Sequence, residues 1–236
     1  MCQRMRLLTL FLVAIVALIV VAAAPEAWAH KKVPFDIARI FIEYNSTGND
    51  LGFHIFLDAE DWEEVEIVSP KWRTIFEVEG KGGFGKLGMT ELFFEGAEPS
   101  LDDVPLEELL NLFPEGKYTF FGTTVEGKTL VSRAMLTHAV PAGPEVSAQV
   151  GPGDSLIISW NAVTGPPAGF PHKPIVIVGY QVIVGSFQVT VPTSITSVTV
   201  SPEFIASLGS GAHAFEVLAI EAGGNQTITE GTFTLP

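Results

Sequence analysis

Short runs of β-branched and aromatic residues, separated by glycine, proline and asparagine, recur along most of this 236-residue chain. In residues 64–68 and 74–79, glutamates alternate with apolar side chains, which is typical of strands with one wet and one buried face. The predicted strands are residues 37–44, 52–57, 64–68, 74–79, 91–95, 117–124, 129–138, 155–161, 175–184, 187–191, 197–200, 212–220 and 228–235. Only residues 104–112 have the apolar spacing of a helix. These patterns predict an all-β protein built as a sandwich.

The first 29 residues have the order of an export signal. Arg4 and Arg6 precede an apolar run over residues 7–24, and Pro25 and the segment Ala27-Trp28-Ala29 follow it. A basic start, an apolar run and small residues at the cleavage site indicate a cleavable signal peptide, residues 1–29, and a secreted or periplasmic protein. The alternative is that residues 7–24 stay attached as a membrane anchor. Cleavage would remove the one cysteine, Cys2, so the remaining chain would fold without disulfides.

A change of composition predicts two domains. Residues 30–143 hold 20 acidic and 10 basic residues, whereas residues 144–236 hold 6 acidic residues and one base, Lys173. Two prolines and a glycine at 141–144 form a stiff linker, so we expect an acidic domain over residues 30–140 and a second domain over residues 145–236. The net charge of −14 argues against nucleic acid as a partner. It also argues against an anionic membrane, so contact with a membrane is expected only if the signal is uncleaved.

Three short motifs in the second half resemble those of fibronectin type III domains. They are Leu156 to Trp160 on an early strand, Tyr180-Gln181-Val182 on a middle strand, and His213 to Ala219 on a late strand. The family carries a tyrosine where this chain has His213. The resemblance covers about residues 144–236 and implies a β-sandwich in which Trp160, Tyr180 and His213 are structural residues.

The first half contains a related motif, Leu112-Phe113-Pro114-Glu115-Gly116-Lys117-Tyr118. It resembles the corner in which a buried tyrosine hydroxyl bonds back to the backbone of the preceding connection. Tyr118 would be that tyrosine. The resemblance implies two tandem immunoglobulin-like or fibronectin type III-like sandwiches, with one short helix in the first.

The glycine-rich segment from residue 80 to residue 88 matches two phosphate-loop strings. Such loops need a following helix, and the second also needs Ser or Thr after its lysine. Here Leu87 follows Lys86, and the next segment is predicted as a strand. We therefore interpret the segment as a flexible loop between strands, with Phe84 at its tip as a possible contact for a partner.

Acidic and amide side chains gather in two segments that the sequence predicts as loops around one strand. Carboxylate and amide oxygens are the ligands that calcium prefers, so these loops are a candidate calcium site. The candidate ligands are Glu43, Asn45, Asn49, Asp50, Asp58 and Asp61. Two alternatives are a pair of solvated polar turns and a pair of glycosidase carboxylates. No other cofactor is expected.

The sequence assembles no catalytic motif. The five histidines lack metal-binding helix spacing, and no Gly-x-Ser-x-Gly elbow is present. His54 is expected to lie on a strand face. The loop over residues 165–174 carries Phe170 and His172, which we expect to contact a partner because sandwich loops commonly carry recognition residues. Asn45 and Asn225 each begin a glycosylation triplet and are expected at surface turns.

These features favour a non-catalytic, exported binding protein whose loops contact a protein or a polysaccharide. One alternative is an accessory subunit that pairs the exposed strands of its second domain with a larger envelope complex. The other is a calcium-dependent hydrolase using Asp58 or Asp61.

Overall fold

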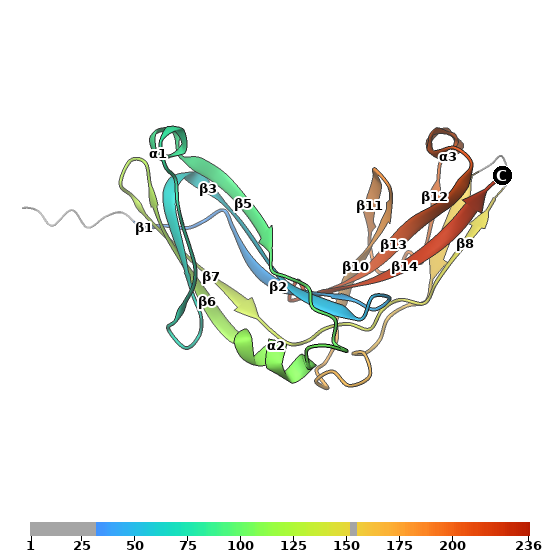
Figure 1. Ribbon diagram of the computed structural model, residues 1–236, viewed down its shortest axis with the longest axis horizontal. Helices are drawn as coiled ribbons and strands as arrows, with labels where there is room; N and C mark the ends of the chain where they lie inside the picture. Colours follow the sequence, from blue (N-terminus) through green and yellow to red (C-terminus); the bar gives the residue numbers. More distant parts are fainter. Residues whose placement is uncertain (1–31, 152–154) are drawn as a thin grey trace, which may run out of the picture.

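The computed structural model describes residues 32–151 and 155–236 as an elongated, curved molecule with a β-rich lobe at each end (Figure 1). We call residues 32–140 the first lobe and residues 145–236 the second lobe. The predicted export signal lies outside the described residues. Within the described part of the chain, no helix has the length and apolar character needed to cross a bilayer.

The first lobe is organised around one long strand, β3. Its other strands are much shorter, and β2, β4, β5 and β6 all pair with β3. The strands are β1 (Lys32–Val33), β2 (Ile37–Asn45), β3 (Asp50–Val68), β4 (Thr74–Glu79), β5 (Met89–Glu95), β6 (Gly116–Thr124) and β7 (Thr129–Leu136). The first part of β3 pairs with β2 and β5, and the last part pairs with β4 and β6. The lobe is thus one folded hydrogen-bonded sheet, with a shared apolar core inside the fold.

The continuity of β3 corrects the prediction of two strands separated by an acidic loop. Residues 58–64 are strand, although five of these seven residues are acidic. The reason is that Ala59 and Trp62 are buried in the core and hold the segment extended, while the pairing of β3 shifts register near Trp62. Such irregularities bend a strand and let it serve two parts of a sheet.

The second lobe is a β-sandwich. Its strands are β8 (Val146–Val150), β9 (Leu156–Trp160), β10 (Ile177–Val184), β11 (Phe187–Val191), β12 (Ser197–Val200), β13 (Gly211–Glu221) and β14 (Gln226–Leu235). A three-stranded sheet, β12-β9-β8, packs on the strands β14-β13-β10-β11. Between them lies a second apolar core that includes Trp160 and Tyr180, whose rings are 5.4 Å apart. The Tyr180 hydroxyl accepts a hydrogen bond from the Val163 amide at 2.9 Å.

Three helices are described, whereas the sequence predicted one. The expected helix is α2 (Leu106–Leu112), and the others are α1 (Gly83–Leu87) and α3 (Pro202–Leu208). α3 begins with Ser201, whose hydroxyl accepts from the Phe204 amide at 3.4 Å, and with Pro202 at its first position. Serine followed by proline is a helix-start signal that the strand-dominated interpretation overlooked. α1 forms inside the glycine-rich segment and corrects the prediction of a loop there.

The two lobes share one eleven-stranded sheet, because β14 pairs in parallel with β2 at the middle of the molecule. The buried side chain of Asn225 fastens this junction. Its oxygen accepts from the Ile42 amide at 2.8 Å, and its nitrogen donates to the carbonyls of Thr137 at 2.8 Å and Ala139 at 3.1 Å. Asn225 is therefore an internal bridge, which corrects its predicted place at a surface turn.

The two predicted corners make the same kind of bond with different side chains. In the first lobe the Tyr118 hydroxyl donates to the Pro114 carbonyl at 3.0 Å. In the second lobe His213 Nε2 lies 3.0 Å from the Gly209 carbonyl, also four residues earlier. Tyr118 is fully buried and His213 is half-buried, so the first corner is the better shielded.

Candidate functional site

The structure does not bring the six predicted calcium ligands together. Asn45 and Asp50 face each other at the β2–β3 turn, whereas Asp58 is paired with Ile37 at the opposite end of the same hairpin. Asp58 is eight residues after Asp50 along the strand, which is about 26 Å at ~3.3 Å per residue. Asp61 lies farther still along β3. The predicted six-residue site is therefore wrong as a single site.

Three of the six residues, Asn45, Asn49 and Asp50, lie near the β2–β3 turn and have local partners. The Asn45 side chain accepts from the Thr47 and Gly48 amides at 2.9 Å each and donates to Glu230 at 2.8 Å. Asn49 donates to Asp102 at 2.9 Å. Burial raises the pKa of Asp50, with the charge of Glu230 adding to the effect. These side chains thus shape the turn and attach it to the second lobe. Calcium binding at this turn stays a prediction.

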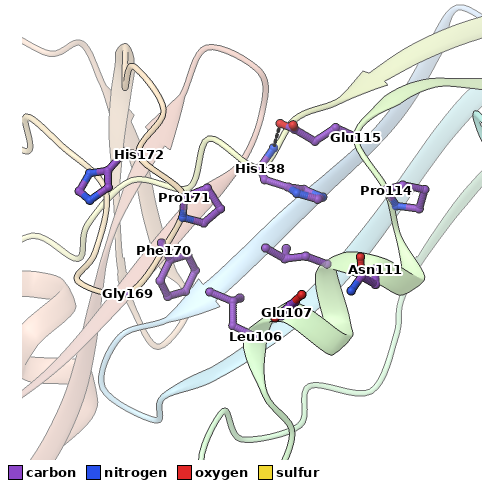
Figure 2. Close-up of a pocket in the computed structure, with 11 residues that line it drawn as sticks. Leu106, Glu107, Asn111, Pro114, Glu115, His138, Gly169, Phe170, Pro171 and His172 are labelled. Carbon is purple, nitrogen blue, oxygen red and sulfur yellow. Dashed lines mark hydrogen bonds between the residues drawn. The ribbon is translucent and has the colours of Figure 1, made fainter.

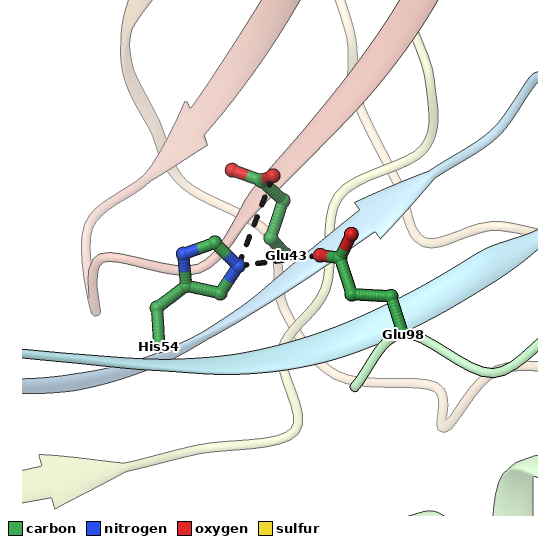
Figure 3. Close-up of side chains that lie close together, drawn as sticks. All are labelled: Glu43, His54 and Glu98. Carbon is green, nitrogen blue, oxygen red and sulfur yellow. Dashed lines mark hydrogen bonds and ion pairs between the residues drawn. The ribbon is translucent and has the colours of Figure 1, made fainter. Parts of the chain in front are cut away.

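Glu43 of β2 belongs to a different cluster, with His54 of β3 and Glu98 of the segment after β5 (Figure 3). His54 Nε2 lies 3.4 Å from Glu98 Oε1, 3.8 Å from Glu43 Oε1 and 3.9 Å from Glu95 Oε2. His54 does lie on a strand face, as predicted, but only 3% of it is exposed because neighbouring side chains cover it. No local sequence pattern indicates Glu98, which is 44 residues from His54 in the chain and approaches it only in the folded protein.

A hollow of about 490 Å³ lies where α2 meets the loop of the second lobe that carries Phe170 and His172 (Figure 2). The Phe170 ring is buried against Tyr44, with centroids 4.8 Å apart, and belongs to the core of the first lobe. This corrects the prediction that Phe170 contacts a partner, because its ring is not at the surface. His172 is exposed at the rim of the hollow.

Polar contacts beside this hollow also join the lobes. Glu115 accepts from the His138 amide at 2.7 Å and from the Lys173 ammonium at 2.8 Å. Burial alone would raise the pKa of the Glu115 carboxyl, but these bonds and the nearby positive charges outweigh it and lower the pKa below the ordinary 4.5. The loop of the second lobe is thus fixed to the first lobe at both Phe170 and Lys173.

Phe84 lies on α1 at the outer end of the first lobe and is exposed, as is Leu87 beside it. α1 has five residues and no side-chain cap at its start, and β5 follows it directly. This is not the long helix that a phosphate loop leads into. Phe84 is therefore exposed on a short helix and not at the tip of a loop, and its contact with a partner stays a prediction.

The β3–β4 turn presents the most exposed aromatic ring in the described part of the chain. Trp72 is 74% exposed and has a φ of 57°, a left-handed conformation that bulky residues rarely adopt. Three bonds hold the turn in this shape: Trp72 N to Ser69 O at 2.9 Å, Ser69 N to Arg73 O at 2.9 Å, and Arg73 N to Ser69 Oγ at 3.2 Å. The structure therefore keeps an indole ring in water on a rigid turn.

Two basic residues, Lys71 and Arg73, are neighbours of Trp72 in the chain, and two more line the hollow beside it. A hollow of about 460 Å³ next to Trp72 is lined by Lys117, Arg133 and Met135 from β6 and β7. We call the exposed set Lys71, Trp72, Arg73, Lys117 and Arg133 the basic-aromatic face. In the described chain the ion-paired lysines are Lys81, Lys128 and Lys173, so none of the face's four cations has a carboxylate partner. Sequence reasoning missed the face, although Lys-Trp-Arg in a turn was a visible signal.

No protein-family model matches the chain, and no curated protein matches it. Among solved structures it is similar to a two-domain fibronectin type III segment of chicken tenascin, with a TM-score of 0.29 and 14% identity over 85% of this chain and 99% of that chain. The ligand-binding domain of human OSCAR gives a TM-score of 0.28 and 10% identity over 87% of this chain and 99% of that one. The spore cortex lytic enzyme SleM of Clostridium perfringens gives 0.33 and 17%, over 40% of this chain and 28% of that enzyme. Because these TM-scores are low, the similarities do not indicate a ligand or an activity.

Proposed function

We propose that this chain is an exported, non-catalytic binding protein whose basic-aromatic face contacts an acidic polysaccharide. The observation that carries the proposal is Trp72, an exposed indole held in a strained turn among four unpaired cations. Backbone strain at an exposed residue has a cost in stability, and it is a reason to look for a function at that residue. Export rests on the sequence of residues 1–29.

The chemistry of the face suits a sugar polymer that carries carboxylates or sulfates. An indole offers a flat apolar surface on which the C–H face of a sugar ring can stack, and its N–H remains free for a hydroxyl. Arginine and lysine side chains pair with the anionic groups, the arginines in a bidentate manner. The hollow between Trp72 and Met135 adds a recess beside the stacking surface.

The net charge of the protein makes this face selective. The whole chain carries −14, so a polyanion is repelled except where the four cations gather. Each exposed ion pair contributes about 0.2–1 kcal/mol, so a single contact is weak and is screened by salt. High affinity therefore requires a polymer with repeated anionic groups. Such a polymer can bind several copies of the protein, or present several sugars to one copy.

The test is affinity electrophoresis and calorimetry with polygalacturonate as the acidic polysaccharide and dextran as the neutral one. We expect binding to polygalacturonate alone, weaker by about tenfold or more at 0.5 M salt. Trp72→Ala and Arg133→Glu should each abolish it. Lys86→Glu is the matched control, because Lys86 is an exposed cation on α1, outside the face. Equal binding to dextran, binding to an acidic peptide or to DNA in place of polygalacturonate, or unchanged binding by both variants would contradict the proposal.

We infer that the molecule is two tandem sandwiches, over residues 30–140 and 145–236, joined through residues 141–144. The separate apolar cores and the Tyr118 and His213 corners support this division. The folded sheet of the first lobe and the burial of Phe170 in its core are departures from two independent domains.

One observation favours the alternative of an accessory subunit. β11 (Phe187–Val191) ends the eleven-stranded sheet, so its outer backbone groups have no strand beside them in the described chain. A strand from another protein can pair with such an edge. Replacing Gln188 with proline would remove an N–H that points away from β10 and so hinder that pairing, and it would leave binding to polygalacturonate unchanged, which separates the two functions.

A further inference from the structure

We propose that His54, Glu43 and Glu98 form a binding site for one divalent transition-metal ion, with Zn²⁺ as the reference metal. The site is separate from the basic-aromatic face and does not rest on the proposed function. An imidazole nitrogen with carboxylate oxygens is a donor set that suits Zn²⁺ and its neighbours better than calcium, which prefers oxygen alone.

The donor atoms are close enough to share one ion. His54 Nε2, Glu43 Oε1 and Glu98 Oε1 all lie within 4.8 Å of one another. Two ligands that hold one zinc ion at ~2.0–2.2 Å in a tetrahedron lie about 3.4 Å apart, so shifts of about an ångström in the side chains complete the site. Glu95, whose carboxylate is 3.9 Å from Nε2, can supply a fourth ligand.

The sheet positions the donors before any ion arrives. Phe41 and Phe93 flank the imidazole, with ring centroids 5.0 Å and 5.8 Å from that of His54. Gly52 makes room for the third donor, because a Cβ at Gly52 would lie 2.7 Å from both Cγ and Oε1 of Glu98. The absence of a side chain at Gly52 therefore lets Glu98 reach the histidine.

A second layer of contacts orients Glu43. Gln226, on β14 of the second lobe, donates its side-chain N–H to Glu43 Oε2, which leaves Oε1 directed at His54 (Figure 3). Bonds of this kind fix a carboxylate ligand and typically change metal affinity about 10–100-fold. Because β14 pairs with β2 here, an ion at this site would also strengthen the junction between the lobes.

The charges favour a cation. Three carboxylates surround one imidazole, and in the described chain no lysine or arginine forms an ion pair with Glu43, Glu95 or Glu98. The Glu43 side chain is only 15% exposed, so its carboxylate is poorly screened by water, and a divalent ion would offset its charge. The competing arrangement is a metal-free cluster in which a protonated His54 pairs with the glutamates.

Titration calorimetry of the full, tag-free chain with ZnCl₂ tests the proposal, with thermal melting as a second readout. We expect one equivalent of Zn²⁺ to bind and to raise Tm by about 5 °C or more at a hundredfold excess over Kd. A millimolar excess of calcium should not displace it. Substoichiometric or absent binding would overturn the proposal and favour the metal-free cluster.

Single substitutions test whether the ion binds at His54, Glu43 and Glu98. Glu98→Gln removes a donor on a partly exposed side chain, and Gly52→Ala pushes the same carboxylate away without removing any ligand atom. Both should weaken zinc binding about tenfold or more, and melting without metal shows that each is folded. Glu91→Gln is the matched control, an exposed glutamate on β5 of the same lobe. Trp72→Ala should bind zinc normally. Wild-type zinc affinity in Glu98→Gln and in Gly52→Ala would overturn the site.

Discussion

The two lobes are both β-rich, and each has a corner bond of the same geometry, yet their surfaces differ. The first lobe holds nine of the ten described lysines and arginines, the exposed Trp72 and the His54 cluster. The second lobe holds one such base, Lys173, and uses it to bind Glu115 of the first lobe. Under the proposed function the first lobe recognises the ligand and the second lobe supports it, through strand β14 and the loop that carries Phe170 and Lys173.

The largest expected effect is at the junction. Asn225→Ala leaves the Ile42 amide without its acceptor in a buried place, and two carbonyls lose a donor. Each unsatisfied buried group costs about 1–3 kcal/mol, so we expect a loss of about 3 kcal/mol in the free energy of unfolding, measured by urea denaturation. Asn161→Ala, an exposed asparagine bonded to Glu145, is the control and should lose less than ~1 kcal/mol. Equal losses would mean that the lobes do not depend on Asn225.

The next largest effect is expected at the Tyr118 and His213 corners, which should contribute different amounts to stability. Burial raises the pKa of Tyr118, so its hydroxyl remains a neutral donor across the physiological range. Tyr118→Phe should lower the free energy of unfolding by about 1–2 kcal/mol, because the Pro114 carbonyl loses its bond in the interior. His213→Phe should cost about half as much, because water reaches that half-buried corner. The same cost at both corners would remove the distinction between them.

At Trp72 we expect a gain in stability with a loss of binding. Trp72→Asn replaces a bulky residue at a φ of 57° with one that accepts the left-handed conformation. The free energy of unfolding should rise by about 0.5–1 kcal/mol while affinity for polygalacturonate disappears. A less stable Trp72→Asn protein would show that the indole serves the fold and not a ligand.

The smallest effect concerns the lobe contact through Glu115. Its pKa is lowered in the folded protein, so its carboxylate stabilises the fold above the ordinary pKa of 4.5 and loses that effect as pH falls through the folded value. Glu115→Gln should therefore be less stable than the wild type at pH 7, by less than about 1 kcal/mol because the pair is partly exposed. The difference should vanish in acid. A difference that persists at low pH would assign the effect to packing.

The correct parts of the fold prediction came from local sequence patterns. The parts that the structure corrects depend on contacts between segments far apart in the chain. β2, β11 and β12 follow from β-branched runs, and the Tyr118 corner follows from a seven-residue motif. Residues 58–63 were predicted as a loop because most of them are acidic, whereas the burial of Trp62 holds them in a strand. Glu98 near His54 and Asn225 between the lobes depend on pairings across 44 and 183 residues, which no local pattern contains.

The direct test of the central claim is tryptophan fluorescence. Trp62 and Trp160 are buried and Trp72 is exposed, so the difference spectrum between the wild type and Trp72→Phe isolates the ring on the basic-aromatic face. Titration with polygalacturonate should move that difference spectrum to shorter wavelength, and dextran should leave it unchanged. A difference spectrum that does not move with polygalacturonate, or moves equally with dextran, would contradict the assignment of recognition to this face of the first lobe.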